Sequence, residues 1–107
     1  MHFTDYQAAA ENTAIYPRSQ GLYYTVLGLT NEAGEVAGLL KKYIRDGEMT
    51  NEDLANKIAA ELGDCLWYLA MVASELGLSF DSIAEKNVDK LLDRQRRGVL
   101  TGSGDER

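Results

Sequence analysis

Four carboxylates recur in two apolar segments of the sequence. The segment LTNEAGEVAGLL, residues 29–40, contains Glu32 and Glu35, and the segment AAELGDCLWYLA, residues 59–70, contains Glu61 and Asp64. Each pair has i, i+3 spacing, which places both side chains on one side of a helical turn. If the two helices pack antiparallel, the four carboxylates converge. Such a cluster repels itself unless cations occupy it, and its oxygen ligands suit Mg²⁺ or Mn²⁺.

The apolar residues around these acids follow the three-four spacing of a helix face. Turning by about 100° per residue places Glu32 and Glu35 along the edge of the buried face and Glu61 in the middle of its face. Three alternatives stay open: the acids pair with buried Lys or Arg, they are solvated at the edge of a thin face, or the inferred rotation is wrong by one position. Because the pair occurs twice, we favour a cation site.

The other potential ligands and nucleophiles are scarce. The chain has one cysteine, Cys65, and one histidine, His2. No disulfide can form within the chain, and zinc sites and Ser-His or Cys-His nucleophiles are close to excluded. A di-iron bundle would need Glu-x-x-His on two helices, and neither acidic pair has a histidine. We expect Cys65 to be a small residue of the core.

The length and net charge of the chain limit the number of domains and the kinds of partner that it can bind. A chain of 107 residues fits one domain. Its net charge of -6 argues against binding to nucleic-acid phosphates and to an anionic membrane surface. No signal peptide or membrane span is visible, so a reducing cytoplasm is the default expectation.

The hydrophobic pattern predicts an all-α fold with four helices. We expect them over residues 4–14, 22–45, 51–77 and 80–96, with Thr4, Thr50 or Asn51, and Ser79 or Asp81 as caps. The Asp46-Gly47 pair should end the second helix. Residues 1–97 then form one four-helix bundle-like domain, and residues 98–107 a Gly-rich tail that is extended or mobile.

Basic residues flank the acidic pairs. Lys57 lies four residues before Glu61, where it either pairs with that glutamate or faces a phosphate. On the fourth helix Asn87, Lys90 and Arg94 share one face. This basic stripe is either solvated near the helix C-terminus or suited to phosphate oxygens.

The two acidic pairs, separated by 25 residues, resemble the signature of the MazG-like nucleoside triphosphate pyrophosphohydrolases. These belong to the all-α NTP pyrophosphatase superfamily. The words NEAGEVAGLLKK and KNVDKLLDR fit this family too, and the similarity runs from about residue 22 to 97. The ending RGVLTGSGDER is similar to the endings of some bacterial and phage members.

The resemblance implies Mg²⁺-dependent hydrolysis of a (deoxy)nucleoside triphosphate to the monophosphate and pyrophosphate. It assigns metal binding and catalysis to Glu32, Glu35, Glu61 and Asp64. It assigns substrate contacts to Lys57, Asn87, Lys90 and Arg94. Asn31 stands where many relatives have another glutamate, which leaves the number of metal ions open.

Assembly and base recognition are further expectations. The second and third helices have wide apolar faces, and Leu27, Leu62, Leu66 and Leu69 extend them, so we expect a helical homo-oligomer. The resemblance favours a homodimer or homotetramer whose site is partly built by a neighbouring subunit. The Gly102–Arg107 tail either reaches such a site, through Asp105 or Arg107, or is disordered.

Aromatic residues near the acids also have two possible roles. Trp67, Tyr68 and the tyrosines of the segment LYYT either stack on a base or pack in the core, and core packing is the simpler role for each.

Two further functions stay open. One is a non-catalytic helical oligomer that keeps the acids as a structural metal site and binds a nucleotide or a protein. The second is a nucleic-acid-binding helical dimer, which the negative net charge disfavours.

Overall fold

The computed structural model describes all residues from 1 to 107, and its regular structure is entirely helical. The predicted all-α class is therefore confirmed. In chain order the elements are α1 (Phe3–Glu11), a short 3-10 helix η1 (Arg18–Gln20), α2 (Gly21–Asp46), α3 (Asn51–Glu75) and α4 (Phe80–Arg97).

Three of the helix ends follow the predicted capping chemistry. Gly47 ends α2 with a φ of 61°, which glycine adopts without steric cost. The Thr50 hydroxyl accepts the Asp53 backbone N–H at 3.1 Å at the start of α3, and the Ser79 hydroxyl accepts the Ser82 N–H at 3.2 Å at the start of α4. Short polar side chains before an apolar repeat therefore locate these ends correctly.

The first helix is shorter than predicted and has a different cap. It ends at Glu11, and the Asp5 carboxylate accepts the backbone N–H of His2 at 3.0 Å at its start. Thr4, the predicted cap, donates its hydroxyl to Asp81 at 2.6 Å. The Thr4 hydroxyl therefore makes a tertiary hydrogen bond to α4 and does not cap α1 as the local sequence predicts.

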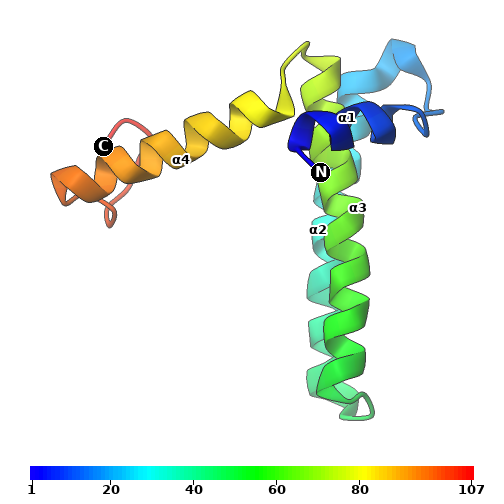
Figure 1. The fold of residues 1–107 in the computed structure, drawn as a ribbon. Helices are drawn as coiled ribbons and strands as arrows, with labels where there is room; N and C mark the ends of the chain where they lie inside the picture. Colours follow the sequence, from blue (N-terminus) through cyan, green and yellow to red (C-terminus); the bar gives the residue numbers. More distant parts are fainter.

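The helices form an L-shaped molecule (Figure 1). α2 and α3 pack side by side as a long antiparallel hairpin, and α1 crosses the end of the hairpin where α3 passes into α4. The Gln7 side chain fastens this junction, because its amide donates to the Leu78 carbonyl at 2.9 Å and its oxygen accepts the Phe80 N–H at 3.0 Å. The acid-bearing segments of α2 and α3 lie on the hairpin itself.

The core is small and lies at the same junction. Only 9 of 107 residues are buried, and five of the six buried apolar ones form one cluster where α1 meets α3 and α4: Ala10, Tyr16, Ala70, Met71 and Phe80. The radius of gyration is 16.8 Å, whereas a compact chain of this length has about 13 Å. The single chain is thus more open than an ordinary domain.

The expected four-helix bundle is not formed within one chain. α4 packs against α1 and α3 near its own start, has no backbone contact with α2, and then extends away from the hairpin (Figure 1). Its apolar side chains Val88, Leu91 and Leu92 stay exposed. Sequence periodicity finds the apolar face of this helix but does not say which surface covers it.

The C-terminal tail also differs from the expectation of an extended or mobile segment. After Gly98, which ends α4 with a φ of 71°, the chain turns back along the helix. Lys90 and Arg94 both contact Asp105, and the Arg107 guanidinium donates to the carbonyls of Val99, Leu100 and Gly104. No helix in the fold combines the length and apolarity that crossing a membrane requires.

Candidate functional site

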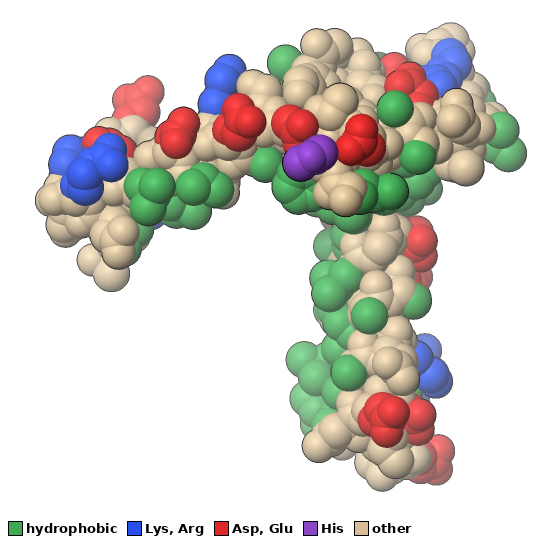
Figure 2. All heavy atoms as spheres, in the orientation of Figure 1, with side chains coloured by type: hydrophobic (Ala, Val, Ile, Leu, Met, Phe, Trp, Pro, Cys, Tyr) green, Lys and Arg blue, Asp and Glu red, His purple; other side chains and the backbone are tan.

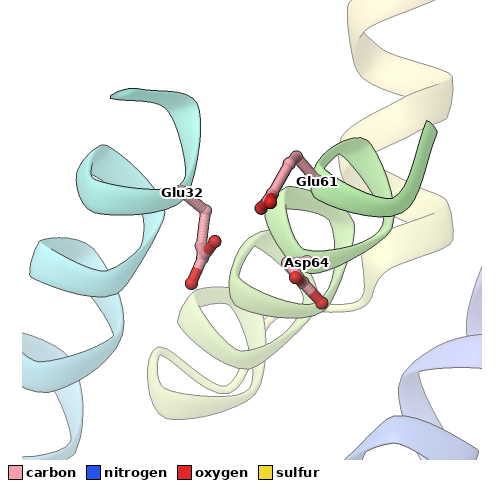
Figure 3. Close-up of side chains that lie close together, drawn as sticks. All are labelled: Glu32, Glu61 and Asp64. Carbon is pink, nitrogen blue, oxygen red and sulfur yellow. The ribbon is translucent and has the colours of Figure 1, made fainter. Parts of the chain in front are cut away.

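Three of the four predicted acids meet between α2 and α3. Glu32 on α2 faces Glu61 and Asp64 on α3, and one carboxylate oxygen of each lies within 4.8 Å of the others (Figure 3). Glu61 and Asp64 are three residues apart on one side of α3; Glu61 points toward Glu32, and Asp64 lies at the solvent-exposed edge of the cluster (Figure 3). The predicted convergence therefore occurs for these three side chains.

The fourth acid lies outside this cluster. Glu35 is exposed and is not among the three carboxylates that approach one another. It follows Glu32 by one helical turn, and its charge still contributes to raising the pKa of Glu32. The i, i+3 spacing thus puts Glu35 on the same flank of α2, but the rotation of α2 against α3 turns only Glu32 inward.

The cluster is more exposed than the apolar surroundings in the sequence indicate. Glu32 and Glu61 are half-buried, and Asp64 is exposed. Burial raises the pKa of Glu32, and the negative charges of Asp64, Glu61 and Glu35 raise it further, together with a hydrogen bond to Glu61. The protein without a cation therefore holds excess negative charge at this point, as we expected from the sequence.

This donor set fits a hard divalent cation. Carboxylate oxygens from two facing helices, with one member open to solvent, match the ligand preference of Mg²⁺, which retains several waters and binds few protein carboxylates. The nearest soft ligand, Cys65, follows Asp64 directly and is only partly buried. Burial and the charges of Glu32, Asp64 and Glu61 raise the pKa of its thiol, which keeps it protonated and inert.

A shallow recess adjoins the acids. Glu32 and Asp64 line it together with Thr13, Trp67 and Tyr68. The Trp67 indole N–H donates to the Thr13 hydroxyl at 2.8 Å, and the Trp67 and Tyr68 rings meet edge to face at 5.0 Å between centroids. The recess is therefore bounded by two packed aromatic rings and by two carboxylates.

Gly28 allows one of these walls to form. A Cβ at Gly28 would overlap the ring of Tyr68, so that ring crosses α2 where the helix has no side chain. Tyr68 also packs near Tyr24, and Tyr24 stacks on Tyr16 at 5.1 Å between centroids. Core packing, the simpler role we expected for these rings, is thus present, and Trp67 and Tyr68 face the recess as well.

The predicted basic residues do not gather at the acids. Lys57 makes no ion pair with Glu61 and instead lines an open surface pocket at the hairpin tip, with Lys42, Tyr43 and Asp53 among its neighbours. Lys57 and Glu61 still belong to neighbouring turns of α3, so Lys57 extends the acid-bearing face toward the tip.

Asn87, Lys90 and Arg94 lie on α4, outside the hairpin. Asn87 is exposed and shares a shallow apolar-walled pocket with Lys90, while Arg94 is 5% exposed. Because α4 extends away from the hairpin, these three residues lie apart from the acids of their own chain (Figure 1).

Sequence reasoning did not identify two features of the site region. Thr13 belongs to the loop after α1, and only the tertiary fold brings it to Trp67. Glu75 accepts a hydrogen bond from Tyr16 and pairs with Arg18 at 3.1 Å, which fixes the loop before α2. Neither contact has a local signal, since the residues are far apart in the sequence.

Comparisons with known proteins agree with the geometry. Residues 20–99 match the family model of the MazG nucleotide pyrophosphohydrolase domain. The chain is also similar to the "Gene 37 protein" of Mycobacterium phage L5, with 44% identity over 115 residues and 100% of both chains covered. No solved structure matches the chain. The matched region contains α2, α3 and α4, and hence every acid of the cluster.

Proposed function

The chain belongs to the MazG nucleotide pyrophosphohydrolase family, and from this premise we propose that it hydrolyses a (deoxy)nucleoside triphosphate to the monophosphate and pyrophosphate with the help of Mg²⁺. The single observation that carries the proposal is the meeting of Glu32, Glu61 and Asp64 within 4.8 Å inside the family-matched region. Mn²⁺ is the other hard cation that this donor set suits.

The three clustered acids, with Glu35 beside them, form the proposed ligand set. A bound Mg²⁺ supplies a lowered water pKa and neutralises charge on the phosphates. The hairpin holds Glu32 opposite Glu61 and Asp64, so the carboxylates are positioned before substrate arrives. Glu35 is exposed beside the cluster and adds to its negative field.

We assign the nucleoside to the recess beside the acids. Trp67 and Tyr68 supply aromatic surface, and Thr13 supplies a hydroxyl at the rim. A base held there places its phosphates next to the acid cluster, because Glu32 and Asp64 line the same recess. The recess is shallow in the single chain, which agrees with a site that another subunit completes.

We place Asn87, Lys90 and Arg94 as phosphate and substrate contacts that act across a subunit interface, and Lys57, on α3 with Glu61 and Asp64, as a substrate contact of the same chain as the acids. Within one chain α4 lies away from the hairpin, so its cations cannot serve the acids of the same chain (Figure 1). Apolar surface lines the inner side of the angle between α4 and the hairpin (Figure 2). A second copy packed into this angle, as in a homodimer or homotetramer, would cover that surface and bring an α4 to each acid cluster.

Pyrophosphate release tests the proposal. We expect turnover of one or more members of a panel of dNTPs and NTPs with Mg²⁺, and no turnover with EDTA. Glu61→Gln and Asp64→Asn should each reduce the rate by about a hundredfold, the upper end of the loss seen when a partner that supports a metal ligand is removed. Their helical circular dichroism should stay intact, because mutual repulsion of the acids falls. Glu52→Gln, in the first turn of α3 outside the cluster, is the matched control.

Two results would contradict the proposal. Full activity in both cluster variants would refute the assignment of Glu61 and Asp64. A folded chain that binds Mg²⁺ and hydrolyses no triphosphate would favour the non-catalytic oligomer with a structural metal site.

A further inference from the structure

The tail places a carboxylate on the two cations of α4. Lys90 Nζ lies 2.8 Å from Asp105 Oδ1, and the same oxygen accepts a hydrogen bond from Arg94 Nη2 at 3.1 Å. Arg94 Nη2 also donates to the Asp105 main-chain carbonyl at 2.7 Å. The contacts to both cations hold the pKa of Asp105 below its ordinary value. The carboxylate therefore occupies the place where an anion from solution would bind.

Asp105 binds only some of the N–H donors of the Arg94 guanidinium. A carboxylate that binds arginine in the bidentate manner takes two parallel N–H donors. Here the tail engages Nη2, and the buried Arg94 Nε has no hydrogen-bond partner although the residue is only 5% exposed. Asp105 Oδ1 is shared between Lys90 and Arg94, whereas a phosphate has enough oxygens to bind both Arg94 donors and Lys90 at once. The arginine is thus more complementary to a phosphate than to the tail that now covers it.

The tail is also held in a way that permits release. The Asp105 side chain is 79% exposed and Lys90 is 39% exposed, so this ion pair is open to solvent and contributes little to stability, whereas the Arg94 partner is buried. Gly102 and Gly104 have φ values of 118° and 87°, so the fold-back depends on two residues that interconvert readily between backbone conformations. Arg107 binds the carbonyls of Val99 and Leu100 and so anchors the far side of the loop on the end of α4. Asp105 can therefore leave while the rest of the loop stays anchored.

We propose that the C-terminal tail is an internal competitor of the substrate: Asp105 occupies Lys90 and Arg94 in the free protein, and the triphosphate displaces it. The inference rests on the proposed function in taking these two cations as phosphate contacts. A tethered carboxylate competes at a high effective concentration, and a triphosphate overcomes it through its larger charge. The apparent affinity for polyphosphate is then reduced by the fraction of molecules whose tail is open.

Binding of inorganic tripolyphosphate to the full chain, measured by titration calorimetry without divalent cations, tests the competition. We expect Asp105→Asn to bind up to about tenfold more tightly than the wild type, which corresponds to a closed tail in about nine-tenths of molecules. Glu106→Gln, the neighbouring exposed acid, should bind as the wild type does. The double variant Lys90→Gln with Asp105→Asn should lose the gain. Equal or weaker binding by Asp105→Asn would overturn the proposal.

A second measurement avoids any effect of the substitution on folding. In the wild-type chain, the heteronuclear NOE of Asp105 and Glu106 should fall when tripolyphosphate saturates the protein, because the Asp105 carboxylate is released while Arg107 keeps the rest of the loop anchored. Unchanged NOE values at saturation would overturn the proposal. Measuring triphosphate hydrolysis as well distinguishes the two proposals. If the chain is inactive and Asp105→Asn binds tripolyphosphate more tightly, only the proposed enzymatic activity is refuted. An active chain with unchanged binding by Asp105→Asn refutes only the competition.

Discussion

Glu32 is the acid whose surroundings bear most directly on the metal site. It is the only acid of the cluster on α2, and it faces two acids of α3. Burial, together with the charges of the neighbouring acids, raises its pKa. An acid whose folded pKa exceeds its unfolded value binds a proton more readily in the folded state, so its ionisation opposes folding. The penalty is absent below the unfolded pKa and develops as the pH rises through the folded pKa.

We therefore predict a distinct pH dependence for the protein in EDTA. As the pH rises from about 4.5 to neutral, the wild type should lose unfolding free energy relative to Glu32→Gln, which has no carboxyl to ionise. Urea unfolding at a series of pH values measures this difference, and all other groups titrate in both proteins. Parallel curves for the two proteins would show that Glu32 carries no such strain.

Magnesium should reverse the penalty at neutral pH. A cation that binds only the folded state stabilises it by about 2.7 kcal/mol at a hundred times its dissociation constant. The wild type should gain this stability, and Glu32→Gln should gain less, because it has lost one carboxylate of the cluster. Equal gains in both proteins would place the bound ion elsewhere. The readout is the shift of the urea midpoint on addition of Mg²⁺.

At the same scale, sequence spacing predicted the convergence of three of the four acids. Both i, i+3 pairs lie on the flanks of α2 and α3 that face each other, and three of their four members converge. The exposure of Glu35 could not be predicted, because the angle between two packed helices decides which member of a pair turns inward. The role of Thr13 had no local signal, since its partner Trp67 is 54 residues away.

At the scale of the helices, three of the predicted helix ends were correct, while the Thr4 cap of α1 and the course of the tail were not. Thr50, Ser79 and Gly47 act through bonds to residues within one turn, so local sequence suffices. The tail has the glycine content of a mobile segment, yet pairing of Asp105 with Lys90 and Arg94 folds it back on α4. The glycine content of the tail indicates a flexible backbone, but it does not reveal that an ion pair with α4 holds the tail in place.

Packing of α3 on α2 depends on Gly28. We predict that Gly28→Ala displaces the Tyr68 ring, because the new Cβ overlaps it, and lowers the unfolding free energy by about 1–3 kcal/mol, as overpacking does. Gly34→Ala, on the same helix with open space around it, should instead stabilise the protein by up to about 1 kcal/mol through helix propensity. Denaturant unfolding of both variants measures the contrast, and a stabilised Gly28→Ala would show that the ring moves freely.

At the scale of the whole molecule, the chain is extended and leaves apolar faces exposed, which is the basis of the assembly that we propose. The exposed side chains include Leu27 at 70% and Leu62 at 54%, two of the residues that the sequence placed on uncovered faces. In the proposed assembly these faces are covered, and α4 of one subunit supplies Lys90 and Arg94 to the acids of another. In this arrangement the acid cluster of a chain and the α4 cations of the same chain serve two different active sites.

Mixing two inactive variants tests this arrangement. Glu61→Gln lacks a ligand of the acid cluster and keeps an intact α4, while Lys90→Gln has the opposite defect. If subunits are unfolded together at equal amounts and refolded, each site draws its acids and its α4 independently from two chains. About one quarter of sites then combine intact acids with an intact α4, so pyrophosphate release should recover to about a quarter of the wild-type rate. Each variant refolded alone is the control. A mixture as inactive as its parents would mean that each site uses the acids and the α4 of the same chain, or that α4 does not serve the acids at all.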